Sequence, residues 1–107
     1  VWEFPVRAQR GWTAAEMIEH AAQGDVDLFW LLGGNFLETV AGEARSRAAL
    51  ARPALRVHQD IVLSSSMLAD SDGDVLILPA ATRYESEGGG TETSTERRRI
   101  FAPEVQG

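Results

Sequence analysis

The segment EGGGTETSTERRRI, residues 87–100, joins three glycines to four hydroxyl side chains and three consecutive arginines. None of these residue types builds an apolar core. Glycine lets a backbone approach a ligand closely, and the guanidinium group of arginine can grip a phosphate with two hydrogen bonds. The segment therefore offers the chemistry of a nucleotide or phosphate site. A solvated arginine run, and a sheet edge with threonine along one face, explain the same residues.

Two other stretches offer related chemistry. Gly33, Gly34 and Asn35 follow an apolar run, where missing side chains bring the backbone close to a phosphate and asparagine can adopt a left-handed turn. Gln59 and Asp60 end a second apolar stretch. In nucleotide-binding folds an acidic side chain at such a strand end accepts hydrogen bonds from a ribose or a base edge.

Each stretch also has a structural explanation. The GGN sequence fits an ordinary strand-to-helix turn, because the chain has no G-x-G-x-x-G fingerprint. Asp60 can cap a following helix. His58 has no second histidine near it in sequence, so we expect it to pack or to face solvent. In DSDGD, residues 70–74, glycine stands fourth, not sixth as in a calcium loop, which indicates a solvated turn.

The elements that must position these residues alternate between helix and strand. Thr13 and Glu16 form a capping-box pattern and Gly24 stands at a helix stop, which predicts a helix over residues 13–23. Continuous apolar runs predict strands covered on both faces, as in a parallel sheet. The remaining expected elements are strands within residues 26–34, 54–60 and 74–80 and helices within 42–52 and 61–70, the serines weakening the last of these.

This order predicts an α/β fold, a small open parallel sheet with Rossmann-like winding over residues 25–82. In such sheets ligands bind beyond the carboxyl ends of the strands. Apolar periodicity disappears from Ala80 onward, so we expect a long irregular C-terminal segment over 83–107. Since the chain starts with Val1 and this tail lacks a core, we expect residues 1–107 to be one domain or a fragment of a larger polypeptide.

Composition narrows the function classes. A formal charge of −6 argues against a nucleic-acid-binding surface. The chain has no cysteine, and therefore no disulfide, thiolate metal site or cysteine nucleophile, which fits a cytoplasmic setting. No apolar run approaches the length needed to span a bilayer, and the first ten residues lack a signal-peptide pattern. We expect no nucleic-acid partner and no membrane insertion.

Four stretches together resemble the molybdopterin oxidoreductases of the dimethyl sulfoxide reductase superfamily, and most closely the formate dehydrogenase alpha-subunit-like branch. Residues 33–36 resemble the family's G-x-N-P turn, and 57–60 its V-x-Q-D. Residues 74–81 resemble the strand ending ADVVLPAA. Residues 85–98 resemble the E-x-E-G-T-x-T-N-x-E-R-R segment, the most specific of the four. The resemblance covers residues 27–107.

The resemblance implies a domain that holds one guanine dinucleotide half of a bis-molybdopterin cofactor carrying molybdenum or tungsten. It implies a glycine turn at the phosphates, an aspartate at the guanine or ribose and the threonine-rich segment near the pterin. The residues expected to contact cofactor are Gly33, Gly34, Asn35, Gln59, Asp60, Gly90, Thr91, Thr93, Glu96 and Arg97. Phe36 replaces the family's proline and Ser94 its asparagine, so the turn geometry and one contact differ from the family pattern.

The family's molybdenum ligand, catalytic histidine and cluster cysteines have no counterpart in these 107 residues, so we expect no catalytic or metal-binding residue in this chain. The favoured hypothesis is a cofactor-binding part of a formate dehydrogenase-like oxidoreductase whose remaining domains are its partners. A stand-alone nucleotide-binding or interaction module without catalysis is the alternative, and a regulatory domain without ligand is a third. An uncovered sheet edge and face would also favour self-association.

Overall fold

The computed structural model describes residues 8–105. Residues 1–7, where the sequence lacks a signal-peptide pattern, and the last two residues of the 83–107 tail lie outside this range. The elements in chain order are α1 (Ala14–Gln23), β1 (Leu28–Leu32), α2 (Phe36–Thr39), α3 (Glu43–Ala51), β2 (Leu55–Asp60), β3 (Asp74–Pro79), β4 (Gly90–Thr93) and β5 (Arg99–Ala102). No helix within residues 8–105 has the length and apolarity needed to cross a bilayer.

The helix expected at residues 13–23 is confirmed as α1. The Thr13 side chain accepts from the Glu16 N–H, and the Glu16 carboxylate accepts from the Thr13 N–H at 2.7 Å, so the capping box is complete. Gly24 ends the helix in the left-handed region, with φ +88°. Ile18 and Ala21 are buried against Ala49 of α3, which forms the core between the helices.

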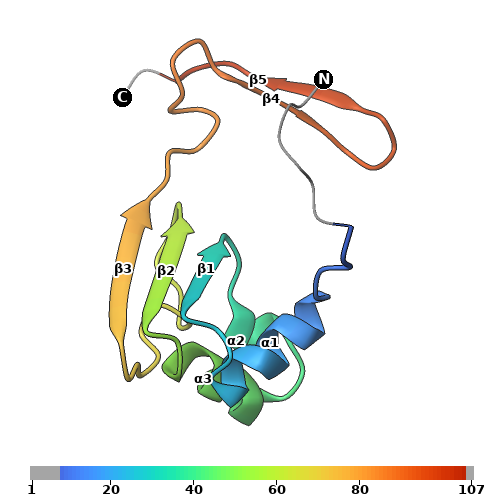
Figure 1. The fold of residues 1–107 in the computed structure, drawn as a ribbon. Helices are drawn as coiled ribbons and strands as arrows, with labels where there is room; N and C mark the ends of the chain where they lie inside the picture. The colour runs from blue at the N-terminus through green and yellow to red at the C-terminus, as the bar shows by residue number, and fades with distance from the viewer. Residues whose placement is uncertain (1–7, 106–107) are drawn as a thin grey trace.

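The parallel sheet is also confirmed, with strand order β1-β2-β3. Leu28 pairs with Leu55 of β2, and Leu55 in turn pairs with Asp74 of β3, so the three strands start level. Their carboxyl ends lie together at one edge of the sheet, which Figure 1 shows at the arrowheads. The α/β class and the three-stranded parallel sheet therefore follow the sequence expectation.

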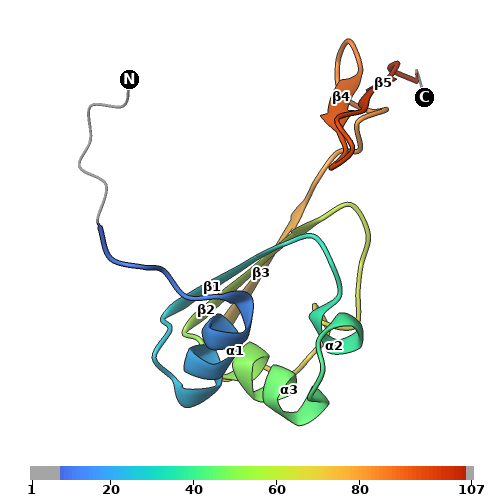
Figure 2. The same cartoon turned by 90° about the vertical axis from the view of Figure 1, so that its right-hand side faces the viewer.

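Only one face of the sheet is covered by helices in residues 8–105. Figure 2 shows α1, α2 and α3 together on the same side. The alternating side chains of β1 reflect this, because Leu31 is buried whereas Trp30 is 53% and Leu32 70% exposed. The expectation of strands covered on both faces is wrong for the described part of the chain. We call the apolar surface formed by Leu28, Trp30, Leu32, Leu55 and Leu76 the open face.

The helix expected at residues 61–70 is wrong, because this stretch forms turns and bends. Carbonyl groups near the end of this stretch accept hydrogen bonds from Arg56, a fully buried side chain on β2. The guanidinium group donates to the carbonyl oxygens of Ala69 at 2.7 Å and Asp70 at 3.2 Å, and to that of Leu50 in α3 at 2.5 Å. The Arg56 side chain thus hydrogen-bonds to both the connection between β1 and β2 and the connection between β2 and β3. The expected turn at DSDGD is present, and Gly73 is required there, because a Cβ would lie 2.4 Å from the Ala54 carbonyl oxygen.

The C-terminal tail contains an antiparallel hairpin of β4 and β5, which the sequence expectation did not include. Residues 94–98 join the strands. The Arg97 N–H donates to the Ser94 carbonyl at 3.0 Å, and the Ser94 N–H donates to the Arg98 carbonyl at 3.2 Å. Arg97 has φ +63° and occupies the loop position that usually carries glycine. Figure 1 shows the hairpin beyond the carboxyl ends of the sheet strands.

Candidate functional site

Backbone hydrogen bonds bring the predicted site residues of the sheet to one rim. The Gly33 N–H donates to the Gln59 carbonyl at 2.9 Å, which extends the pairing of β1 and β2 past the end of β1. The Ala80 N–H donates to the Asp60 carbonyl at 3.0 Å on the other side. Gly33, Gln59 and Asp60 therefore lie side by side at the sheet edge where parallel α/β folds bind ligands.

The two rim glycines combine left-handed backbone with open space. Gly33 has φ +68° and Gly34 has φ +82°, conformations that side-chain-bearing residues rarely adopt. A Cβ built on either glycine would meet no atom within 4 Å. The glycines are thus needed for the turn, and the space beside them is free for a ligand to approach the backbone.

Asn35 is oriented by the chain itself. Its side-chain nitrogen donates to Ser65 Oγ at 2.8 Å, and its Oδ1 accepts from Ser66 Oγ at 2.6 Å. Ser66 Oγ also accepts from the Leu37 N–H at 3.1 Å. This network ties the turn after β1 to the connection after β2 and engages both ends of the asparagine amide. Sequence reasoning missed the role of Ser65 and Ser66, whose only signal was their unsuitability for a helix interior.

Asp60 and His58 occupy different environments on β2. Asp60 Oδ1 accepts from the Ile61 N–H at 2.7 Å, yet no helix follows, so the helix-cap explanation for this aspartate is wrong. His58 is 2% exposed, in agreement with the expectation that it packs, and its Nε2 has no hydrogen-bond partner among residues 8–105. Burial, followed by the charge of Arg56, lowers the pKa of His58. The histidine is therefore a neutral core residue.

The predicted site residues of the tail lie on the hairpin, at a different place from the rim glycines. Side chains alternate along β4, so Thr91 and Thr93 occupy one face and Glu92 the other. Glu96 and Arg97 lie in the loop at the far end. The structure thus groups the candidates into a rim set and a hairpin set.

The glycines before β4 allow the tail to fold on itself. A Cβ on Gly89 would lie 2.3 Å from the Ala102 carbonyl oxygen, and one on Gly90 would lie 2.7 Å from Arg83 Cβ. The Gly88 N–H donates to the Glu104 carboxylate at 2.8 Å. Gly89 and Gly90 therefore have a packing role in the hairpin. Gly90, a predicted cofactor contact, is already approached by Arg83.

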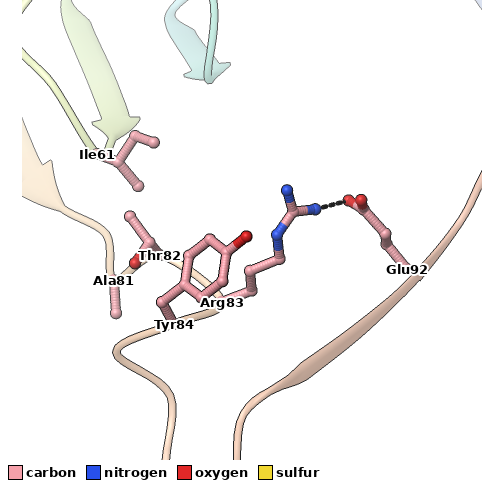
Figure 3. Close-up of a pocket in the computed structure, with 6 residues that line it drawn as sticks. All are labelled: Ile61, Ala81, Thr82, Arg83, Tyr84 and Glu92. Carbon is pink, nitrogen blue, oxygen red and sulfur yellow. Dashed lines mark ion pairs between the residues drawn. The ribbon is translucent and has the colours of Figure 1, made fainter. Parts of the chain in front are cut away.

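A cavity of about 390 Å³ lies where the hairpin meets the end of the sheet. Its lining residues are Ile61, Ala81, Thr82, Arg83, Tyr84 and Glu92. Figure 3 shows Arg83 extending from the segment after β3 toward Glu92 on β4, with which it forms an ion pair. The Arg83 guanidinium also lies 5.4 Å from the centre of the Tyr84 ring. None of these lining residues was among the predicted site residues.

The described residues contain donors and acceptors suited to a nucleotide, but not a metal cluster. Within residues 8–105, no three histidine, aspartate or glutamate side chains gather in a way that could hold a metal ion. Comparisons of the chain with protein-family models, with curated proteins and with solved structures each gave no match. Function is therefore inferred from the geometry of the site and from the sequence motifs.

Proposed function

We propose that this chain binds one guanine dinucleotide half of a bis-molybdopterin cofactor in a formate dehydrogenase-like oxidoreductase that depends on molybdenum or tungsten. The observation that carries the proposal is the rim at the carboxyl ends of the strands. There, Gly33 and Gly34 leave the backbone open next to Gln59 and Asp60. In open α/β sheets this place receives dinucleotide ligands.

Each part of the ligand has a candidate partner. The phosphates would lie against the backbone of the rim glycines. The guanine or ribose would bind the Asp60 carboxylate, and the pterin would lie against the hairpin. The cofactor would supply the redox chemistry, while this chain would orient it. The metal ligand and substrate contacts are assigned to the remaining domains of the oxidoreductase, which are the proposed partners in the cytoplasm.

A titration of the protein with guanosine diphosphate tests the nucleotide-binding part of this proposal. Asp60→Asn removes the rim charge and should weaken binding about tenfold, the cost of losing one good charge-assisted hydrogen bond. Asp74→Asn removes an equal charge from the opposite, amino-terminal end of β3 and should leave the affinity unchanged. Equal affinities for wild type and Asp60→Asn would contradict the assignment. Absence of binding at millimolar nucleotide would favour the ligand-free regulatory alternative.

Self-association through the open face is a second part of the proposal. Parallel sheets are normally covered on both faces, whereas Trp30 and Leu32 are more than half exposed. Leu32→Glu should reduce the average molecular mass measured by light scattering at high protein concentration. A monodisperse wild-type monomer under these conditions would contradict self-association.

A further inference from the structure

The cavity between the hairpin and the sheet has chemistry that the rim lacks. Its volume of about 390 Å³ lies within the range of roughly 300–1,000 Å³ that small-molecule sites occupy. Ile61 and Ala81 provide apolar surface and Tyr84 an aromatic ring, while the charged groups belong to Arg83 and Glu92. A site of this kind suits a flat ligand with a polar edge.

The charges of the cavity favour a neutral ligand over a free anion. Arg83 and Glu92 form an ion pair, so their charges largely cancel within the lining. The contact joins Arg83 Nη1 to Glu92 Oε2. A carboxylate has about four acceptor positions on its two oxygens, so Glu92 keeps capacity for further hydrogen bonds after this contact. Arg83 thereby orients the Glu92 carboxylate and leaves it able to accept hydrogen bonds from a ligand.

We propose that this cavity binds a planar heterocycle through a 2-amino-4-oxopyrimidine edge, with Glu92 accepting the ring N–H and the adjacent amino N–H and with the Tyr84 ring as a wall. Guanine and pterins share this edge. The inference rests on the proposed function, since both rings occur in the proposed cofactor, and it adds Glu92 and Tyr84 to the residues that hold it. Arg83 is a positioning residue.

The position of Glu92 supports the same assignment. It faces the cavity from β4, and the alternation of the strand turns Thr91 and Thr93 to the opposite side of the hairpin. Ile100 pairs directly with Glu92 and therefore shares its face. The side of the hairpin toward the sheet thus presents one carboxylate next to apolar surface.

Calorimetric titrations of the 107-residue protein test the inference. The ligands are guanosine monophosphate, inosine monophosphate, which lacks the 2-amino group, the phosphate-free 6-hydroxymethylpterin and inorganic phosphate. We expect the guanosine nucleotide to bind about tenfold more tightly than the inosine nucleotide, because one hydrogen bond to the carboxylate is lost. Glu92→Gln should remove this preference. Glu87→Gln, an equal change at an exposed position outside the cavity lining, should preserve it.

The outcomes separate this inference from the proposed function. Tighter binding of the pterin than of the guanosine nucleotide, dependent on Glu92, would assign the cavity to the pterin, and the reverse order would assign it to guanine. The inference would be overturned if Glu92→Gln changed neither the pterin affinity nor the preference between the two nucleotides. Displacement of the ligands by phosphate, or binding of none of them, would overturn it as well. If nucleotide binding depends on Asp60 while neither the pterin nor the nucleotides depend on Glu92, only the inference fails. If the pterin binds through Glu92 while nucleotide binding ignores Asp60, only the proposed rim function fails.

Discussion

Replacement of Arg56 by methionine should strongly destabilise the fold. The side chain is fully buried, and its two shortest hydrogen bonds reach the Leu50 carbonyl at 2.5 Å and the Ala69 carbonyl at 2.7 Å. Methionine keeps much of the apolar stem but cannot donate to either oxygen. The end of α3 and the connection after β2 would then lose their shared partner.

The magnitude follows from these contacts. Hydrogen bonds to a charged group contribute about 1.5–3 kcal/mol each, so the two short bonds give roughly 3–6 kcal/mol. Burial lowers the pKa of Arg56, which reflects the cost of removing its charge from water. Methionine escapes this cost, and the two effects partly offset each other. We expect a net decrease of about 3 kcal/mol in the free energy of unfolding.

Urea unfolding followed by far-ultraviolet circular dichroism measures this change. Arg45→Met is the matched control, because Arg45 is exposed and its ion pair within residues 8–105 is with Glu19, at 3.1 Å. Such a surface pair contributes less than about 1 kcal/mol. Arg56→Lys keeps the charge without the forked donor and should be intermediate, which gives a measurable variant if Arg56→Met does not fold. Equal losses for Arg56→Met and Arg45→Met would refute the reasoning.

Three further changes test the pKa, the packing and the backbone strain. The pKa of buried His58 is lowered, so the unfolded chain binds a proton more readily than the folded chain as the pH falls below about 6.5. Stability is therefore retained above this pH and declines below it. His58→Gln should flatten this decline down to about pH 5.5, as measured by urea unfolding at a series of pH values. Gly73→Ala, whose Cβ would lie 2.4 Å from a carbonyl oxygen, should lower the thermal midpoint by several degrees, whereas Gly11→Ala, with nothing within 4 Å, should not. Arg97→Gly relieves a left-handed residue and should stabilise the hairpin by about 1 kcal/mol, measured by amide hydrogen exchange; equal protection would contradict the strain.

Local signals predicted much of the sheet and helix layer. Thr13, Glu16 and Gly24 specify the ends of α1 through neighbouring residues alone, and the apolar runs marked the three parallel strands. The connection at residues 61–70 was mispredicted because its end is held by Arg56, a residue of the adjacent strand that donates to the carbonyl groups of Ala69 and Asp70. Such a contact has no local sequence signature.

In the tail and the site, too, contacts between residues distant in sequence could not be predicted from local sequence signals. The hairpin escaped prediction because Arg97 occupies the position where glycine or asparagine normally signals this loop. The rim glycines were identified from their type, while the pairing of Asn35 with Ser65 joins residues 30 positions apart. The cavity depends on Arg83 meeting Glu92 across two segments, so residue types and spacing could not reveal it.

The one-sided helix layer has a consequence for the order of assembly. Both connections between neighbouring strands contribute to the same side of the sheet, as the contacts of Arg56 with each of them require. No described segment crosses the open face, so a second layer can be added after the strands have paired, without rethreading the chain. Removing that layer would likewise leave the strand pairing and the rim intact. Folding of this body and covering of its open face are thus separable steps, and the second can be driven by concentration alone.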